Sequence, residues 1–391
     1  MKLGFFTDHP VNTSETFIHE LLVRLEQALG SANLFHVVGN RNGQQVVENT
    51  YFGKFSVRRK WLKVLGQGEK ALSLELHSSF RVRRAAAERV MKQFKKKDLP
   101  DVAYFEFGQP AVLFRRFMEE HNIPMVVHFH GMDASSAFNS VSYAQEIKRV
   151  FDYSTCIITA SHHIKRLLVL KGCPIEKIRV VRLGVKVAEI KPLPREQRTT
   201  KPSVIFLGRL TEKKNPIALI YAFSLVKKTV SDAQLTIVGD GPLLKEVQDL
   251  LVKLDLSDSV TLKGAMPNAS ALELLSKHWI YAQHSVTASN GDQEGFAISP
   301  AEAAAYELPV VSTLHNGIPE HVIDGVTGYL VREFDFESMA ERMIQLLQNP
   351  DLSLKLGQNG RKNILGLNDP EKRIESILGI LQLAYQSDKA E

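Results

Sequence analysis

Short apolar runs alternate with helix-periodic stretches along the whole chain. In the first half the apolar runs are KLGFFTD, NLFHVVG, VAYFEF, PMVVHFH, TCIIT and IRVVRL, with amphipathic stretches such as SETFIHELLVRLEQALG between them. The second half repeats this alternation with PSVIFLG, AQLTIVG, SVTLKG, IYAQHS, LPVVST and GYLVREF. Strands that alternate with helices predict parallel sheets, so we expect an α/β protein with two doubly wound domains.

The segment VKVAEIKPLPREQRTTKP separates the two alternations, and it is rich in proline and poor in apolar residues. We therefore expect a Rossmann-like domain over residues 1–186, a linker over 187–201 and a second Rossmann-like domain over 202–365. The helical stretch 366–391 is expected to pack back toward the first domain.

The composition is that of an ordinary globular protein, with 44% hydrophobic and 24% charged residues among 391. No apolar stretch reaches the ~18 residues that a membrane helix needs, and the N-terminal MKLGFFTDHP is expected to be a buried strand rather than a signal peptide. The two cysteines, Cys156 and Cys173, suit neither a disulfide framework nor a zinc site. These features predict a cytoplasmic location.

Positive charge is concentrated in one segment of the first half. Residues 54–97 carry 14 basic and 3 acidic side chains, and Trp61, Leu62, Val64 and Leu65 lie among them. Such a segment would be attracted to anionic lipid, nucleic acid or an anionic polysaccharide, and a solvated helical face explains it equally well. We take an anionic membrane surface as the working hypothesis and expect no nucleic-acid partner.

The segment IFLGRLTEKKNP places two cations after a predicted strand. Arg209 follows the strand end at Gly208, and Lys214 precedes Pro216, where a helix is expected to begin. Preorganised cations stabilise negative charge that develops on a bound anion. Arginine offers phosphate oxygens a planar fork, and lysine a point charge. The alternative is that Arg209 and Lys214 are surface cations near a helix start that bind no ligand.

Glu294 and Glu302 bracket the segment EGFAISPAE, which lies between the polar loop TASNGDQ and the apolar run LPVVST. The order loop, helix, strand puts residues 296–298 at a helix N-terminus, where backbone N–H groups bind anions. SPAE is also an S-x-x-E pattern with Pro300 at the first helical position, so a capping box that binds no ligand is the alternative for Glu302.

Taken together, these motifs resemble the retaining glycosyltransferases of family 4, which have the GT-B fold of two Rossmann-like domains facing each other across a cleft. The resemblance spans both domains, is strongest over 202–335, and is closest to the exopolysaccharide transferases of the colanic-acid type. It implies transfer of a hexose from a nucleotide sugar to a glycan or lipid-linked acceptor, with a UDP-sugar favoured as donor and a GDP-sugar as the alternative. It also implies that no metal or other cofactor is needed, which agrees with the absence of an Asp-x-Asp pair.

The resemblance assigns roles to residues of the second half. Arg209 and Lys214 are expected to hold the donor diphosphate, Glu294 the sugar and Glu302 the ribose hydroxyls. The GDGP turn and the segment VTLKGAMPN are expected beside the nucleotide and its base. The implied donor-binding set is Arg209, Lys214, Gly239, Lys263, Gly264, Met266, Glu294, Phe296, Ala297, Ile298 and Glu302.

In the first half, the resemblance implies that His130 faces the donor sugar, whereas a strand-end histidine packed under a loop is the alternative. His128 is expected on the other face of the strand. The implied catalytic set is His130, Arg209, Lys214 and Glu294. The first-loop residues expected to approach phosphate and acceptor are Thr13, Ser14 and Glu15.

Other classes share parts of this pattern. A sugar-nucleotide epimerase of the GT-B fold would break the same C–O bond, and a non-catalytic nucleotide-sugar-binding protein would keep every residue named above. A dinucleotide oxidoreductase is disfavoured, because no G-x-G-x-x-G follows the first strand.

Overall fold

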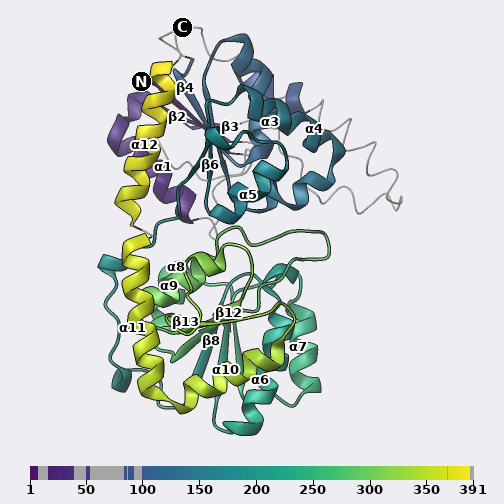
Figure 1. Ribbon diagram of the computed structural model, residues 1–391, viewed down its shortest axis with the longest axis vertical. Helices are drawn as coiled ribbons and strands as arrows, with labels where there is room; N and C mark the ends of the chain where they lie inside the picture. The colour runs from purple at the N-terminus through teal and green to yellow at the C-terminus, as the bar shows by residue number, and fades with distance from the viewer. Residues whose placement is uncertain are drawn as a thin grey trace. The chain divides into compact units, whose positions relative to one another are not determined.

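A computed structural model shows that the chain forms two compact units (Figure 1). Unit 1 comprises Met1–Val181 and Lys372–Glu391, and unit 2 comprises Arg182–Glu371. The structure describes residues 1–7, 16–38, 50–52, 83–85, 87–91, 99–367 and 369–387. Within these residues, no helix combines the length and the apolar character needed to cross a membrane.

Unit 1 is built on a seven-stranded parallel sheet with the order β3-β2-β1-β4-β5-β6-β7. Its strands are β1 (Leu3–Thr7), β2 (Leu34–Val38), β3 (Thr50–Phe52), β4 (Val102–Glu106), β5 (Met125–Phe129), β6 (Cys156–Thr159) and β7 (Ile178–Val180). Strands β1, β2, β4 and β5 are buried along their whole length, which explains their continuous apolar runs. The edge strand β3 was not predicted from the sequence.

Helices cover this sheet, and the last of them comes from the far end of the chain. They are α1 (Thr16–Leu29), α3 (Gly108–Glu120), α4 (Val141–Tyr153), α5 (His162–Leu170) and α12 (Pro370–Ser387). Ile377 and Leu381 of α12 pack in the same core as Leu21 of α1 and Phe5 of β1, and Figure 1 shows α12 beside α1. The C-terminal helix is therefore part of unit 1.

Unit 2 has a six-stranded parallel sheet with the order β10-β9-β8-β11-β12-β13. Its strands are β8 (Ser203–Leu207), β9 (Gln234–Val238), β10 (Val260–Gly264), β11 (Ile280–Ala282), β12 (Val310–Thr313) and β13 (Gly328–Val331). Its helices are α6 (Pro216–Thr229), α7 (Leu244–Lys253), α8 (Asn268–Ser276), α9 (Ile298–Ala305), α10 (Phe336–Gln348) and α11 (Pro350–Leu367). Helix α6 packs against α7 and α10, and α9 packs against α8 and α11, so helices cover both faces of the sheet.

Both sheets have the doubly wound topology of Rossmann-like domains, which confirms the predicted fold class. In unit 1 the strand order reverses between β1 and β4, and in unit 2 between β8 and β11. Ligands of such sheets bind beyond the carboxyl ends of the strands at this reversal. In unit 2 the topology therefore directs attention to the loops that follow β8 and β11.

Residues 187–201, interpreted from the sequence as a linker, lie within unit 2. They include two short 3-10 helices, Val187–Glu189 and Arg195–Gln197. The guanidinium of Arg361 donates to two carbonyl oxygens of this stretch, at 3.0 and 2.8 Å. The stretch is thus packed onto its unit, and the division by contacts falls between Val181 and Arg182.

Candidate functional site

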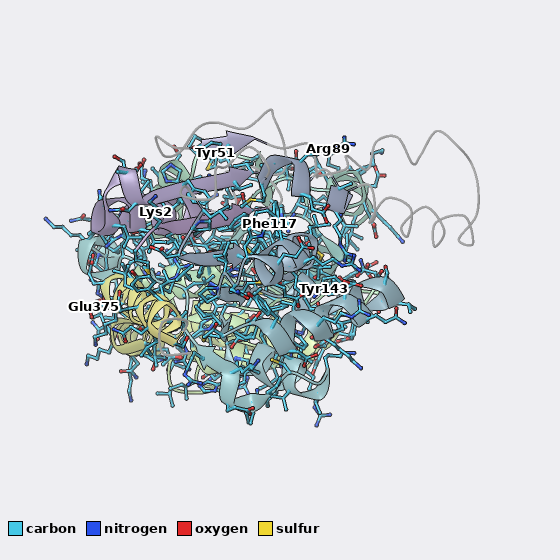
Figure 2. All side chains as sticks on the ribbon, turned by 90° about the horizontal axis from the view of Figure 1, so that it is seen from above. Lys2, Tyr51, Arg89, Phe117, Tyr143 and Glu375 are labelled. Carbon is cyan, nitrogen blue, oxygen red and sulfur yellow. The ribbon has the colours of Figure 1, made fainter. Side chains whose placement is uncertain are left out.

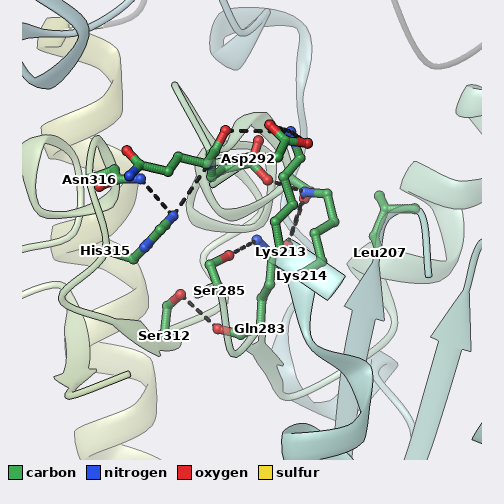
Figure 3. A network of polar contacts seen from close by, with 12 residues as sticks. Leu207, Lys213, Lys214, Gln283, Ser285, Asp292, Ser312, His315 and Asn316 are labelled. Atoms are coloured by element: carbon green, nitrogen blue, oxygen red, sulfur yellow. Dashed lines mark hydrogen bonds and ion pairs between the residues drawn. The ribbon is translucent and has the colours of Figure 1, made fainter. Parts of the chain in front are cut away.

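Lys214 lies at the reversal of strand order in unit 2 (Figure 3). It ends a 3-10 turn that follows β8, and its Nζ is 2.9 Å from Oε2 of Glu294 and 3.5 Å from Oε1 of Gln283. The lysine stem crosses Gly208, where an added Cβ would lie 2.9 Å from Cδ of Lys214. Glycine at position 208 therefore allows the lysine to fold back over the end of β8.

Three strand-end loops lie side by side around this lysine. The N–H of Leu210 donates to the carbonyl of Asp240 at 2.9 Å, and the N–H of Gly239 donates to the carbonyl of Gly264 at 2.8 Å. Gly239 has a φ of +137°, and a Cβ there would lie 1.9 Å from the carbonyl oxygen of Gly208. The GDGP turn thus needs glycine to pack against the loop that carries Arg209.

The remaining donor-site candidates of these loops are placed at the rim. The side chains of Arg209 and Lys263 are exposed, and that of Met266 is partly buried. Gly264 has a left-handed φ of +66°, which turns the chain sharply after β10. The structure brings these loops together, and the assignment of phosphate and base contacts to them stays a prediction.

Glu294 is a partly buried carboxylate held by cations. Burial alone would raise its pKa, but the ammonium groups of Lys214 and Lys213 outweigh burial and lower the pKa of Glu294 to about 2. Lys213 also lies 3.3 Å from a carboxylate oxygen of Asp292. The two lysines therefore fasten the loop after β11 to the loop after β8.

Glu302 lies on α9 and has the opposite electrostatic character. Burial raises its pKa to about 7, although a hydrogen bond with Asn268 and the charge of Lys214 act in the other direction. Two carboxyl groups near the same lysine thus have pKa values that lie on either side of the ordinary value of 4.5.

The capping-box alternative for Glu302 is wrong. Helix α9 begins at Ile298, two residues before Pro300, and its N-cap Ala297 makes no side-chain cap hydrogen bond. The Ser299 hydroxyl instead accepts a hydrogen bond from the hydroxyl of Tyr281 at 2.9 Å. Of residues 296–298, only Ile298 belongs to the first helical turn, while Ala297 is the N-cap and Phe296 precedes it. An anion at the N–H groups of these residues remains a prediction.

Beneath the lysine lies a buried polar network that sequence reasoning missed. The Tyr281 hydroxyl also lies 2.7 Å from Oε1 of Gln283, whose Nε2 donates to the Ser285 hydroxyl at 2.6 Å. The Ser312 hydroxyl donates to the backbone carbonyl of Gln283 at 2.7 Å (Figure 3). The available signal was the run of polar residues at the end of an otherwise apolar strand.

In unit 1, His130 follows β5 and belongs to a buried polar cluster. Its Nε2 is hydrogen-bonded to Oε2 of Glu106, and its ring lies between those of Phe17 and Phe107, at centroid distances of 5.1 and 4.9 Å. Asp133 accepts hydrogen bonds from the backbone N–H groups of His130 and Gly131, at 3.0 and 2.9 Å. The ring is thus packed as the structural alternative describes, and a contact with the donor sugar stays a prediction.

The expectation for His128 was wrong. Its ring centroid lies 4.1 Å from that of His130, because residues two apart in a strand point to the same face. The Tyr104 hydroxyl lies 2.8 Å from Nδ1 of His128 and donates to Oε1 of Glu106 at 3.3 Å. Burial lowers the pKa of His128 well below the usual range of histidine. Burial also raises the pKa of Tyr104 well above the usual range of tyrosine, so both side chains are neutral.

Glu106, His128 and His130 are the group of described residues that could hold a metal, since their ligand atoms lie within 4.8 Å of one another. Imidazole and carboxylate together suit Zn²⁺. Glu106 is, however, engaged with Nε2 of His130, and Nδ1 of His128 with Tyr104. Among the described residues, Nε2 of His128 and Nδ1 of His130 are buried without a hydrogen-bond partner. The arrangement observed is that of a hydrogen-bonded cluster.

Two sequence predictions fall mainly outside the described residues. The first-loop residues Thr13, Ser14 and Glu15 lie there, as does most of the basic segment 54–97. Within that segment, Arg84 is paired with Glu146 at 2.6 Å, and Arg89 is exposed. Figure 2 shows Arg89 and Tyr51 of β3 along the same side of unit 1.

Comparisons with known proteins cover nearly the whole chain. The family model "Glycosyltransferase Family 4" matches residues 15–189, and "Glycosyl transferases group 1" matches residues 189–363. The chain is 26% identical over 373 residues to the amylovoran biosynthesis glycosyltransferase AmsK of Erwinia amylovora, covering 89% of this chain and 91% of AmsK. It is 33% identical over 250 residues to the putative colanic acid biosynthesis glycosyltransferase WcaL of Escherichia coli K12, covering 63% and 62% of the two chains.

Among solved structures, HepE of Anabaena in complex with UDP and glucose matches with a TM-score of 0.76 and 17% identity, covering 98% of this chain and 99% of HepE. The protein is therefore a glycosyltransferase with the GT-B fold. These matches confirm the resemblance to family 4, with the family 4 model over the first half and the group 1 model over the second.

Proposed function

We propose that this glycosyltransferase moves a hexose from a UDP-sugar to a glycan or lipid-linked acceptor in exopolysaccharide assembly, with retention of configuration and without a metal. The observation that carries the proposal is the ion pair of Lys214 and Glu294 at the strand-order reversal of unit 2. The names of AmsK and WcaL support the pathway, and the UDP in HepE supports the nucleotide.

The residues of unit 2 supply the groups that this reaction needs. Arg209 and Lys214 would hold the diphosphate together with the first N–H groups of α9, because cations and a helix N-terminus both favour developing negative charge. Glu294 would accept hydrogen bonds from the sugar hydroxyls, and Glu302 from the ribose. The leaving diphosphate would then take the acceptor proton on the same face of the sugar, which retains the configuration.

Binding of the donor is tested with a panel of UDP-, GDP- and ADP-sugars in a thermal-shift assay. We expect stabilisation by at least one UDP-sugar, unchanged by EDTA. Stabilisation by GDP-sugars alone would mean that the donor nucleotide is GDP and not UDP. Binding that requires Mg²⁺ or Mn²⁺ would contradict metal independence. Turnover of the donor without acceptor into an epimerised nucleotide sugar would make the protein an epimerase. Donor binding with no turnover even when acceptor is present would make it a nucleotide-sugar-binding protein.

We further propose that the basic segment 54–97 holds the enzyme at an anionic membrane surface, where a lipid-linked acceptor would be found. The support is its 14 basic against 3 acidic side chains. Co-sedimentation with vesicles should increase with the fraction of anionic lipid and decrease with salt. Equal binding to neutral and anionic vesicles, or binding to neither, would overturn this proposal.

A further inference from the structure

His315 lies in the turn after β12, and its side chain is fully buried. Its Nδ1 is 2.6 Å from Oε1 of Glu333. Its Nε2 is 3.2 Å from the backbone N of Glu294 and 2.7 Å from Nδ2 of Asn316 (Figure 3). Both nitrogens of this imidazole are thus engaged, and each faces a different segment of unit 2.

These contacts determine which nitrogen of His315 carries the proton. A backbone N–H can only donate a hydrogen bond, and so can an amide nitrogen, so Nε2 must accept from Glu294 and Asn316. The proton of the neutral ring is then on Nδ1 and is donated to Glu333. Asn316 has a left-handed φ of +51°, a conformation that asparagine adopts more readily than most residues.

The same two side chains hold both ends of the loop that carries Glu294. The second carboxylate oxygen of Glu333 accepts the backbone N–H of Thr287 at 2.9 Å, at the start of the loop. His315 accepts the N–H of Glu294 at its end. The side chain of Glu294 then meets Lys214 from this fixed backbone position, at 2.9 Å. Glu333 and His315 therefore connect the turns after β12 and β13 to the Lys214–Glu294 pair.

We infer that His315 is a positioning residue that sets the place of Glu294, and that it thereby governs recognition of the donor sugar rather than of the nucleotide. The inference rests on the proposed function, in which Glu294 contacts the sugar and other groups contact the nucleotide. Without the acceptor at Nε2, the N–H of Glu294 is left unpaired in a partly buried site, and the loop must shift to satisfy it. Affinity for the sugar part of the donor should fall, and affinity for the nucleoside diphosphate should not.

The test is isothermal titration of the whole protein with matched pairs of ligands: UDP and UDP-glucose, UDP and UDP-galactose, and GDP and GDP-mannose. For the pair that the wild type binds, His315→Ala should lower the affinity for the nucleotide sugar by about tenfold, the size expected for one hydrogen bond. The affinity for the nucleoside diphosphate should fall by less than about twofold. His315→Gln should restore part of the loss, because its amide oxygen can accept the N–H of Glu294.

His278 provides the matched control. It is a second buried histidine of unit 2 with both ring nitrogens engaged, by the Leu274 carbonyl at 2.7 Å and the Thr236 hydroxyl at 2.8 Å. His278→Ala should leave the ratio of the two affinities unchanged. A fall in thermal stability in both variants, with an altered ratio in His315→Ala alone, would separate positioning from general destabilisation.

The outcomes distinguish this inference from the function on which it rests. If the wild type binds none of the nucleotide sugars, the proposed function is overturned. The inference is overturned if the wild type binds one of them and His315→Ala lowers the affinities for the nucleotide sugar and the nucleoside diphosphate equally. It is also overturned if neither affinity changes. A ¹⁵N spectrum of the imidazoles gives a readout that needs no ligand: we expect His315 to carry its proton on Nδ1, and a proton on Nε2 would contradict the positioning role.

Discussion

At the scale of single residues, Lys214 and Glu294 determine each other's charge. The depressed pKa of Glu294 means that the pair stabilises the folded protein above the ordinary pKa of 4.5, and that this contribution is lost as the pH falls toward about 2. Removing Lys214 leaves a partly buried carboxylate without its nearest cation. A loss of stability is therefore expected along with any loss of catalysis.

We predict that Lys214→Ala and Arg209→Ala both lower turnover by roughly 10²–10³-fold, as for the loss of one preorganised donor. Only Lys214→Ala should also lower the melting temperature, because Arg209 is exposed and Lys214 pairs with the partly buried Glu294. Steady-state kinetics and thermal unfolding of the two variants check this. Normal turnover in either variant would remove that residue from the phosphate site.

Glu302 should make nucleotide binding dependent on pH. Because burial raises its pKa to about 7, the ionised form is disfavoured in the free protein, and stability falls as the pH rises from 4.5 through about 7. A ribose that needs the carboxylate as acceptor should bind better above about pH 7. Titration at about pH 6, 7 and 8 should show this increase in the wild type, and weaker, pH-independent binding in Glu302→Gln. The same pH dependence in both proteins would exclude the ribose role.

His130 offers a choice between catalysis and packing. If it contacts the sugar, His130→Ala should lower turnover while the affinity for UDP stays near that of the wild type, because the proposed nucleotide site lies in unit 2. Titration and kinetics on one preparation give both numbers. A lower melting temperature with normal turnover would mean that the ring serves only to fill the space between Phe17 and Phe107.

At the scale of elements, the close approach of the GDGP turn to the end of β8 makes a sharp prediction. Gly239→Ala should lower both the melting temperature and nucleotide affinity, since its Cβ would lie 1.9 Å from the Gly208 carbonyl oxygen and its φ is positive. Gly366→Ala, within α11 and with nothing within 4 Å of an added Cβ, is the control and should be neutral or stabilising. Equal effects of the two changes would contradict the packing described here.

The elements themselves were largely predictable, because buried parallel strands are continuous apolar runs. The start of α9 was not predictable: Ser299 resembles a cap, yet its hydroxyl is engaged by Tyr281, and Pro300 is tolerated in a first turn whose N–H groups lack intrahelical partners. The roles of Gln283 and His315 were also missed. Each depends on partners from distant segments, which the local pattern does not contain.

At the scale of the whole molecule, the two Rossmann-like units share the order of their first six strands, to which unit 1 adds β7. The chemistry inferred for unit 2 falls at the reversal of that order. The loops after β8, β9, β10 and β11 supply nearly all of the candidate donor residues. The motifs of these loops are separated in the sequence, and the topology explains why the first and the last of them meet at one lysine.

The central claim is a retaining, metal-independent transfer of a sugar from a nucleotide donor. It is tested most directly by proton NMR of the first product formed in EDTA, with glycolipids of the source organism as acceptors. We predict a glycoside with the anomeric configuration of the donor, formed by the wild type only when acceptor is present and not by Lys214→Ala. A product of inverted configuration, or turnover that EDTA abolishes and a divalent metal restores, would contradict the account.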